Sequence, residues 1–144
     1  MIFHYTVSGT DFSQAGAASA DIKKKLQMLG IPVSVVKRTA VAMYEAEINM
    51  VVHADGGETT VEVTDTEIVI IMADRGPGIP DIGLAMQEGY STAPPLVQEL
   101  GFGAGMGLPN MKRNSDFLTI ESQPGEGTTV TMRIVISEHP EAES

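Results

Sequence analysis

The chain opens with an alternating pattern and then changes to a helical period. The first strand is predicted by apolar residues that alternate with polar neighbours: Phe3, Tyr5 and Val7. Over residues 15–29 the apolar positions recur at helical spacing, and Asp11 followed by Gln14 resembles a capping box. We therefore expect a strand followed by a helix that ends at Gly30.

A second helix and a hairpin follow. The helical pattern resumes at Pro32 and runs to about Ala54, where Asp55-Gly56-Gly57 is expected to end it. Two strands come next: Thr59–Thr64 alternates, and Glu67–Ala73 is almost continuously apolar. The apolar strand is expected to lie inside the sheet because both of its faces are suited to burial.

The second half of the chain mixes regular and irregular segments. Residues 81–87 form a short predicted helix, and residues 88–100 are irregular and suit a lid. Leu108–Arg113 opens another helix. A last hairpin is predicted from Phe117–Ser122 and Thr128–Ile136.

This order of elements predicts an α+β fold. Strands, helices and further hairpins imply a two-layer sandwich with helices on one face of a mixed, mostly antiparallel sheet. No repeat is visible, so residues 1–137 are interpreted as a single domain. Residues 138–144 are rich in glutamate and are expected to be a disordered acidic tail.

Composition narrows the classes of function. The chain of 144 residues has 9 basic and 19 acidic residues, a net charge of -10 and no cysteine. The negative field disfavours nucleic acid and anionic membranes, and the absence of thiols excludes disulfides and thiolate metal sites. The most apolar run, Ile68–Ala73, is far shorter than the ~20 residues that span a bilayer, and a signal-peptide pattern is missing. We expect a soluble cytoplasmic protein.

The second predicted helix carries a narrow polar stripe among mostly apolar positions. At about 100° per residue the stripe collects four side chains: Arg38, Glu45, Asn49 and His53. Glu47 points the other way. A carboxylate and a carboxamide one turn apart suit a proton acceptor and an oxygen ligand for Mg²⁺. The alternative is an ordinary solvated helix face.

Asp74 follows the apolar strand and precedes Arg75-Gly76-Pro77-Gly78. A carboxylate at a strand end with glycines beyond it is well placed to accept a hydrogen bond from a ligand amine. An Asx turn that ends the strand is the alternative. Thr128 begins the last strand on the side that faces the helices, so its hydroxyl needs a partner, either backbone or Asp74 with a bound ligand.

Glycine occupies every second position from Gly101 to Gly107, just before a predicted helix. Glycine lets backbone N–H groups approach a ligand closely, which suits a loop wrapped on phosphate oxygens. Pro109 fits the first turn of the helix, whose N-terminus would point its positive end at an anion. Lys112 and Arg113 add two positive charges nearby. The alternative is a flexible surface loop.

Four motifs in this order resemble those of the Bergerat-fold ATPases, which include gyrase, a heat-shock chaperone, histidine kinases and mismatch-repair ATPases. The motifs are Glu45-x-x-x-Asn49, Asp74-x-Gly76-x-Gly78, Gly101-x-Gly103-x-Gly105-x-Gly107 and Gly127-Thr128. Within that superfamily the chain resembles the anti-sigma serine kinases, and most closely the switch kinases of bacterial stress signalling. Two phrases carry this second resemblance: Glu88-Gly89-Tyr90-Ser91-Thr92 and the segment from Gly107 to Arg113.

The resemblance implies ATP and Mg²⁺ as ligands. Glu45 would be the general base and Asn49 the Mg²⁺ ligand, while Asp74, supported by Thr128, would bind the adenine amino group. The ribose and the triphosphate would contact both loops and the helix that follows them: Gly76, Gly78, Gly101, Gly103, Gly105, Met106, Gly107, Leu108, Lys112 and Arg113. Three features depart from the family pattern: Glu47, Met50 and Pro94-Pro95. These departures bear on lid closure and partner docking more than on nucleotide binding.

The function that the resemblance favours is an ATP-dependent serine/threonine kinase. Its substrate would be an anti-anti-sigma or scaffold protein of the STAS type in a partner-switching pathway, with a sigma factor or a downstream phosphatase as further partners. The alternative is a nucleotide-dependent module that sequesters a sigma factor or another regulator without phosphotransfer. A bare ATPase is a third hypothesis. A histidine kinase is disfavoured because no histidine lies on a separate helical hairpin. The first strand and helix are a candidate homodimer surface.

Overall fold

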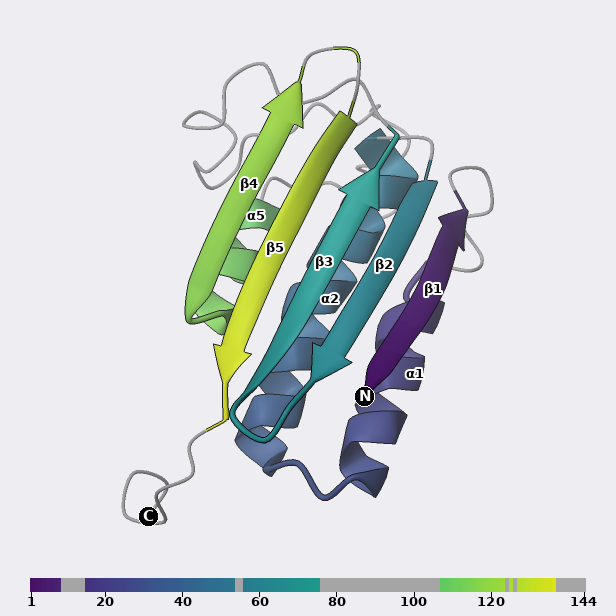
Figure 1. Cartoon of the computed structure of the whole chain (residues 1–144). Coiled ribbons are helices and arrows are strands. Elements are labelled where there is room, and N and C mark those ends of the chain that lie inside the picture. The colour runs from purple at the N-terminus through teal and green to yellow at the C-terminus, as the bar shows by residue number, and fades with distance from the viewer. Residues whose placement is uncertain (9–14, 54–55, 76–106, 124, 126, 137–144) are drawn as a thin grey trace.

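The computed structural model describes residues 1–8, 15–53, 56–75, 107–123, 125 and 127–136. In this part of the chain five strands form one sheet, and helices cover one of its faces (Figure 1). The strands are β1 (Ile2–Ser8), β2 (Gly56–Val63), β3 (Glu67–Asp74), β4 (Phe117–Gln123) and β5 (Gly127–Val135). The helices are α1 (Ala17–Met28), α2 (Val33–His53) and α5 (Gly107–Asn114). The predicted two-layer α+β fold is confirmed.

The strand β3 lies at the centre of the sheet, whose order is β1-β2-β3-β5-β4. Its nearly continuous apolar run predicted this inner position. The sheet was expected to be mixed and mostly antiparallel, and every pairing between the described strands is antiparallel. None of the described helices is both long and apolar enough to cross a membrane.

The register of the sheet sends every second residue into the core. One row across the sheet joins Val61, Ile70 and Met132, and each of these side chains has 0% of its surface exposed. The row belongs to one buried cluster with Leu26 of α1 and Met43 of α2. Burying an apolar side chain of this size contributes about 1.5–3 kcal/mol. Residues at the strand ends that lie an even number of positions from this row therefore also face the helix layer.

The strand β2 begins at Gly56, earlier than the predicted start at Thr59. The sequence Asp55-Gly56-Gly57 was expected to end the second helix, which does end at His53, but Gly56 and Gly57 already belong to the strand, and Gly57 pairs with Asp74 in the ladder. A Cβ at Gly57 would collide with the carbonyl oxygen of Ala73 and would lie 2.8 Å from the Asp74 Cα. This glycine therefore permits a close approach of two strands.

The helix α1 begins at Ala17 and not near Asp11, because its N-terminus is capped from another helix. Gly16 is the N-cap residue, with φ of 93°, and no side chain of the same helix end caps it. The carboxylate of Glu47 on α2 accepts three backbone hydrogen bonds of 2.9–3.1 Å from this helix start: Gly16, Ala18 and Ser19. Glu47 is only 2% exposed. The predicted capping box at residues 11–14 lies outside the described part.

Candidate functional site

Glu45 points from α2 toward α5, and a hydrogen bond joins the two helices at this point. The Nδ2 atom of Asn110 donates to Glu45 Oε2 at 2.9 Å, and both residues are half-buried. Asn49 is also half-buried and lies one turn further along the same face of α2. At Glu45 the polar stripe of α2 therefore contacts α5. This contact argues against the alternative that the stripe is an ordinary solvated helix face.

The other two residues of the stripe have different surroundings. Arg38 forms an ion pair of 3.2 Å with Asp116, in the short connection between α5 and β4. This contact lies about two helical turns from Glu45 along α2. His53 is the last residue of α2, and its side chain lies outside the described part. Arg38 therefore attaches α2 to the segment that follows α5.

Asn110 contacts the predicted site residue Glu45, and sequence reasoning did not single it out. Its Oδ1 atom accepts a hydrogen bond of 2.8 Å from Arg113 Nη1, so its amide connects Glu45 to a guanidinium. A signal was present in the sequence, since Asn110 and Arg113 are separated by three positions and lie on one face of a helix. The bond from Asn110 to Glu45 could not be predicted in the same way, because the two residues lie on different helices.

Asp74 ends β3 between two glycines of the neighbouring strands. Its Oδ1 atom accepts a hydrogen bond of 2.9 Å from the backbone N–H of Thr128. Gly57 lies on one side, and Gly127, with φ of 114°, lies on the other. A Cβ at Gly127 would collide with the Asp74 carbonyl oxygen and would lie 3.2 Å from Asp74 Oδ1. The two glycines thus form a cradle around Asp74, with Gly57 close to its Cα and Gly127 close to its carbonyl group and carboxylate.

Thr128 faces the helix layer, as its register in β5 predicted, and it is 6% exposed. Its hydroxyl is 2.9 Å from the hydroxyl of Ser122 on β4, and the backbone N–H, not the hydroxyl, contacts Asp74. The hydroxyl partner is therefore neither of the two that the sequence suggested. Ser122 was missed because a serine on an alternating strand gives no signal of its own.

Several of these residues share one end of the molecule. In Figure 1 the C-terminal ends of β3 and β4 and the start of β5 lie at the top, beside the C-terminal end of α2. Asp74, Ser122 and Thr128 occupy those strand ends, and Asn49 lies in the last turns of α2. The fold therefore brings two of the predicted motifs, Glu45 to Asn49 and Asp74 with Thr128, to the same end of the sandwich.

Much of the predicted glycine loop is not described. The residues outside the described part include the short helix and lid at 81–100 and the following site residues: Gly76, Gly78, Gly101, Gly103, Gly105 and Met106. Gly107 begins α5, and Pro109 lies in its first turn as predicted. Leu108 is 7% exposed and belongs to the core, whereas Lys112 and Arg113 are exposed. The side chain of Leu108 therefore packs inward.

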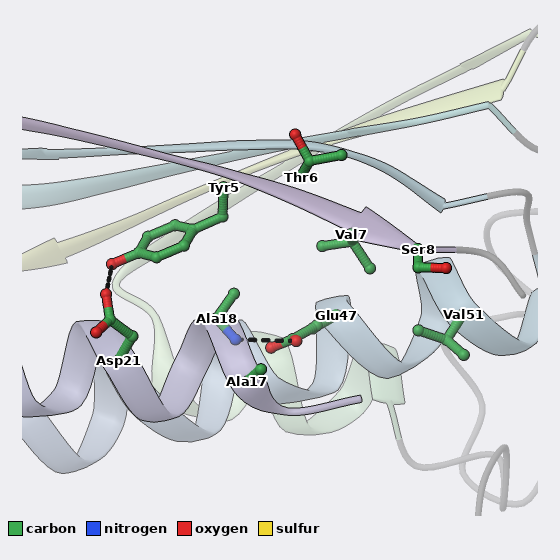
Figure 2. Close-up of a pocket in the computed structure, with 9 residues that line it drawn as sticks. All are labelled: Tyr5, Thr6, Val7, Ser8, Ala17, Ala18, Asp21, Glu47 and Val51. Atoms are coloured by element: carbon green, nitrogen blue, oxygen red, sulfur yellow. Dashed lines mark hydrogen bonds between the residues drawn. The ribbon is translucent and has the colours of Figure 1, made fainter. Parts of the chain in front are cut away.

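A cavity of about 370 Å³ lies elsewhere, between β1, α1 and α2 (Figure 2). Glu47 lines it, but none of the predicted site residues does. Tyr5 OH donates a hydrogen bond of 2.6 Å to Asp21 at its wall, and burial together with this bond raises the Tyr5 pKa to about 12. The Tyr5 and Asp21 side chains of the wall thus bond to each other, and the cavity is separate from the candidate site.

Comparison with known proteins gives matches to one family and to named relatives. A family model described as histidine kinase-, DNA gyrase B- and HSP90-like ATPase matches residues 34–138. The chain is 37% identical over 95 residues to the anti-sigma F factor of Pasteuria penetrans, covering 61% of this chain and 60% of that relative. It is 37% identical over 97 residues to the serine/threonine-protein kinase RsbT of Bacillus subtilis (strain 168), covering 65% of this chain and 67% of the relative.

A solved structure supports the fold alone. The RsbU and RsbW domains of a Mycobacterium tuberculosis protein superpose on this chain with a TM-score of 0.65 at 18% sequence identity. The match covers 96% of this chain and 33% of the other. The shared feature is therefore the arrangement of sheet and helices.

Proposed function

Because the chain belongs to the family of histidine kinase-, DNA gyrase B- and HSP90-like ATPases, we propose that it is an ATP-dependent protein serine/threonine kinase. Its substrate would be a STAS-type antagonist protein in a partner-switching pathway. The observation that carries the proposal is Glu45, held by Asn110 on the face of α2 that also bears Asn49. The relative named a serine/threonine-protein kinase supports the same reaction.

The cradle around Asp74 supports the binding of an adenine base. Gly57 and Gly127 leave no room for a Cβ, so the flanking backbones are kept close to Asp74, with Gly57 at its Cα and Gly127 at its carbonyl group and carboxylate. The Thr128 N–H fixes one carboxylate oxygen, which sets the orientation of the group. A carboxylate held in this way accepts a hydrogen bond from the exocyclic amine of adenine, a donor that guanine presents at a different position.

The donor set near Glu45 fits a hard divalent cation. Asn49 supplies a carboxamide oxygen, which is ligand chemistry suited to Mg²⁺, and Asn49 is the residue that would hold it. When bound, Mg²⁺ would neutralise charge on the triphosphate oxygens. The exposed cations Lys112 and Arg113 on α5 would add to that neutralisation.

Glu45 would act as the general base in the transfer step. Its carboxylate takes the proton from a serine or threonine hydroxyl of the substrate as that oxygen bonds to the γ-phosphorus of ATP. The bond between the γ-phosphorus and the bridging oxygen breaks, and ADP leaves with that oxygen. The step therefore yields a phosphorylated side chain, ADP and a protonated Glu45.

A second function, sequestration of a sigma factor without phosphotransfer, is supported by the relatives named anti-sigma F factor. The two functions are distinguished by one experiment. The chain is used to recover partners from its source cell with and without ATP and Mg²⁺, and [γ-³²P]ATP is then added to each complex. We expect label on a serine or threonine of a STAS-domain protein. Stable binding of a sigma factor with no label on any partner would support sequestration in place of the kinase.

The adenine contact gives a prediction for Asp74. Asp74→Asn should weaken ATP binding about 10–100-fold, because a hydrogen bond to a charged group contributes roughly 1.5–3 kcal/mol. The Asn oxygen can still accept from the Thr128 N–H, so the fold should be retained. Isothermal titration calorimetry measures the affinity, and Asp65→Asn, in the exposed β2–β3 turn, is the matched control. Equal affinity of Asp74→Asn and wild type would rule out the adenine contact.

A further inference from the structure

Asn110 spans the contact between α5 and the proposed general base. Its amide donates to Glu45 Oε2 at 2.9 Å and accepts from Arg113 Nη1 at 2.8 Å. Asn110 lies on the first turns of α5, which begins at Gly107, the last glycine of the predicted phosphate loop. One side chain thus connects the helix after that loop to the carboxylate on α2.

The orientation of the Asn110 amide is determined by its two partners. A flipped amide would set its oxygen against the Glu45 carboxylate and its NH₂ against the Arg113 guanidinium, so both contacts would become repulsive. The Arg113 guanidinium has donors and no acceptor, so it binds the Asn110 oxygen and fixes the NH₂ toward Glu45. The two charged partners therefore determine that the NH₂ group, and not the oxygen, of Asn110 faces Glu45.

The bond also restrains Glu45. A glutamate side chain has several rotatable bonds, and ordering it costs roughly 1.5–2 kcal/mol of rotamer entropy. Asn110 holds one carboxylate oxygen from a neighbouring helix, so part of that ordering is present before a substrate binds. A base held in place in advance is what proton transfer requires, because misplacement by about 1 Å costs on the order of 100-fold in rate.

We propose that Asn110 is a positioning residue for Glu45, which it orients through its side-chain amide while Arg113 fixes the direction of that amide. This inference rests on the proposed kinase function, in which Glu45 is the base. In this proposal Asn110 acts through Glu45 and not directly on ATP or on the substrate hydroxyl. Its removal should therefore lower kcat while the affinity for ATP stays the same.

The test compares variants that differ in a single group. Asn110→Asp keeps the size of the side chain and the acceptor for Arg113, but it replaces the donor to Glu45 by a negative oxygen. Asn110→Ala removes the donor without adding charge. Asn114→Ala is the control, because Asn114 donates to the Asn110 backbone oxygen at 2.8 Å and does not contact Glu45 in the described structure. The rate of ³²P transfer from ATP to the STAS-domain partner is measured at saturating ATP and Mg²⁺.

We expect kcat to fall about 10–100-fold in Asn110→Ala and further in Asn110→Asp, with ATP affinity within about twofold of wild type. Asn114→Ala should transfer at the wild-type rate. Unchanged kcat in Asn110→Ala, or a loss of ATP affinity that parallels the loss of kcat, would indicate no role in positioning or a purely structural one, and either result would overturn the inference. If wild type transfers nothing to any partner, the proposed function fails, which is a different outcome from an unaffected Asn110 variant.

A second measurement detects the contact between Asn110 and Glu45 without an activity assay. The side-chain NH₂ resonances of Asn110 in an ¹H–¹⁵N NMR spectrum should shift in Glu45→Gln, and those of Asn114 should not. In a double-mutant cycle, Asn110→Asp should have no further effect on the residual rate of Glu45→Gln, because both act through one carboxylate. Additive losses, or unchanged Asn110 resonances, would contradict a role through Glu45.

Discussion

Replacing Glu47 by alanine is expected to lower the free energy of unfolding by about 3–5 kcal/mol. The Glu47 carboxylate is 2% exposed and accepts three backbone hydrogen bonds at the start of α1, which has no capping side chain of its own. Without it, those N–H groups lose their partners in a buried position, and the positive end of the helix loses a negative charge. Urea unfolding followed by circular dichroism measures the loss.

A second variant at Glu47 tests the contribution of its charge, and a variant on β2 serves as the control. Glu47→Gln keeps the volume but has one acceptor oxygen, and its NH₂ would face backbone donors, so an intermediate loss of about 1–3 kcal/mol is expected. Glu62→Ala, on the exposed side of β2, should change the stability by no more than about 0.5 kcal/mol. An unchanged urea midpoint for Glu47→Ala would show that water or a rearranged chain start replaces the cap.

Phosphotransfer should be lost when Glu45 is replaced by glutamine. The Gln oxygen can still accept from Asn110, so the contact between α2 and α5 is retained, but the carboxamide does not take a proton at neutral pH. The rate of transfer to the STAS-domain partner should fall about 10²–10⁴-fold, which is the usual contribution of a general base. ATP affinity should be close to wild type.

The control for this variant is Glu121→Gln, an exposed glutamate of β4. It removes the same charge without touching α2 or α5, so its transfer rate should equal that of wild type. Single-turnover transfer of ³²P at saturating ATP measures the chemical step directly. Full activity of Glu45→Gln would exclude Glu45 as the base and leave the assignment of a proton acceptor open to another residue.

The sequence predicted the elements because each has a local period. The alternation at Phe3, Tyr5 and Val7 reappears as β1, and the apolar run of β3 reappears at the centre of the sheet. The position of Thr128 on the helix-facing side followed from the same two-residue period. Motif order was equally local, and it was enough to identify the ATPase family that the comparison confirms.

The predicted boundaries failed where a distant residue decides the local conformation. The strand β2 was predicted to start at Thr59, but Gly57 already pairs with Asp74, because only glycine fits against β3 at that point. The start of α1 was assigned to a local capping box, but the cap comes from Glu47 on α2. Neither contact leaves a period or a motif near the residue that it affects.

By itself the sequence determined which faces are buried and which chemical groups are present, because periodicity and residue type are properties of the local chain. It placed Glu45 and Asn49 on one helix face and Glu47 on the other. Only the tertiary structure decided what each group contacts: Glu45 with Asn110, Arg38 with Asp116, Glu47 with the start of α1, and Thr128 with Ser122. The physical reason is that a hydrogen bond or ion pair needs its partner within about 3–4 Å, and that proximity is set by how the helices and strands pack.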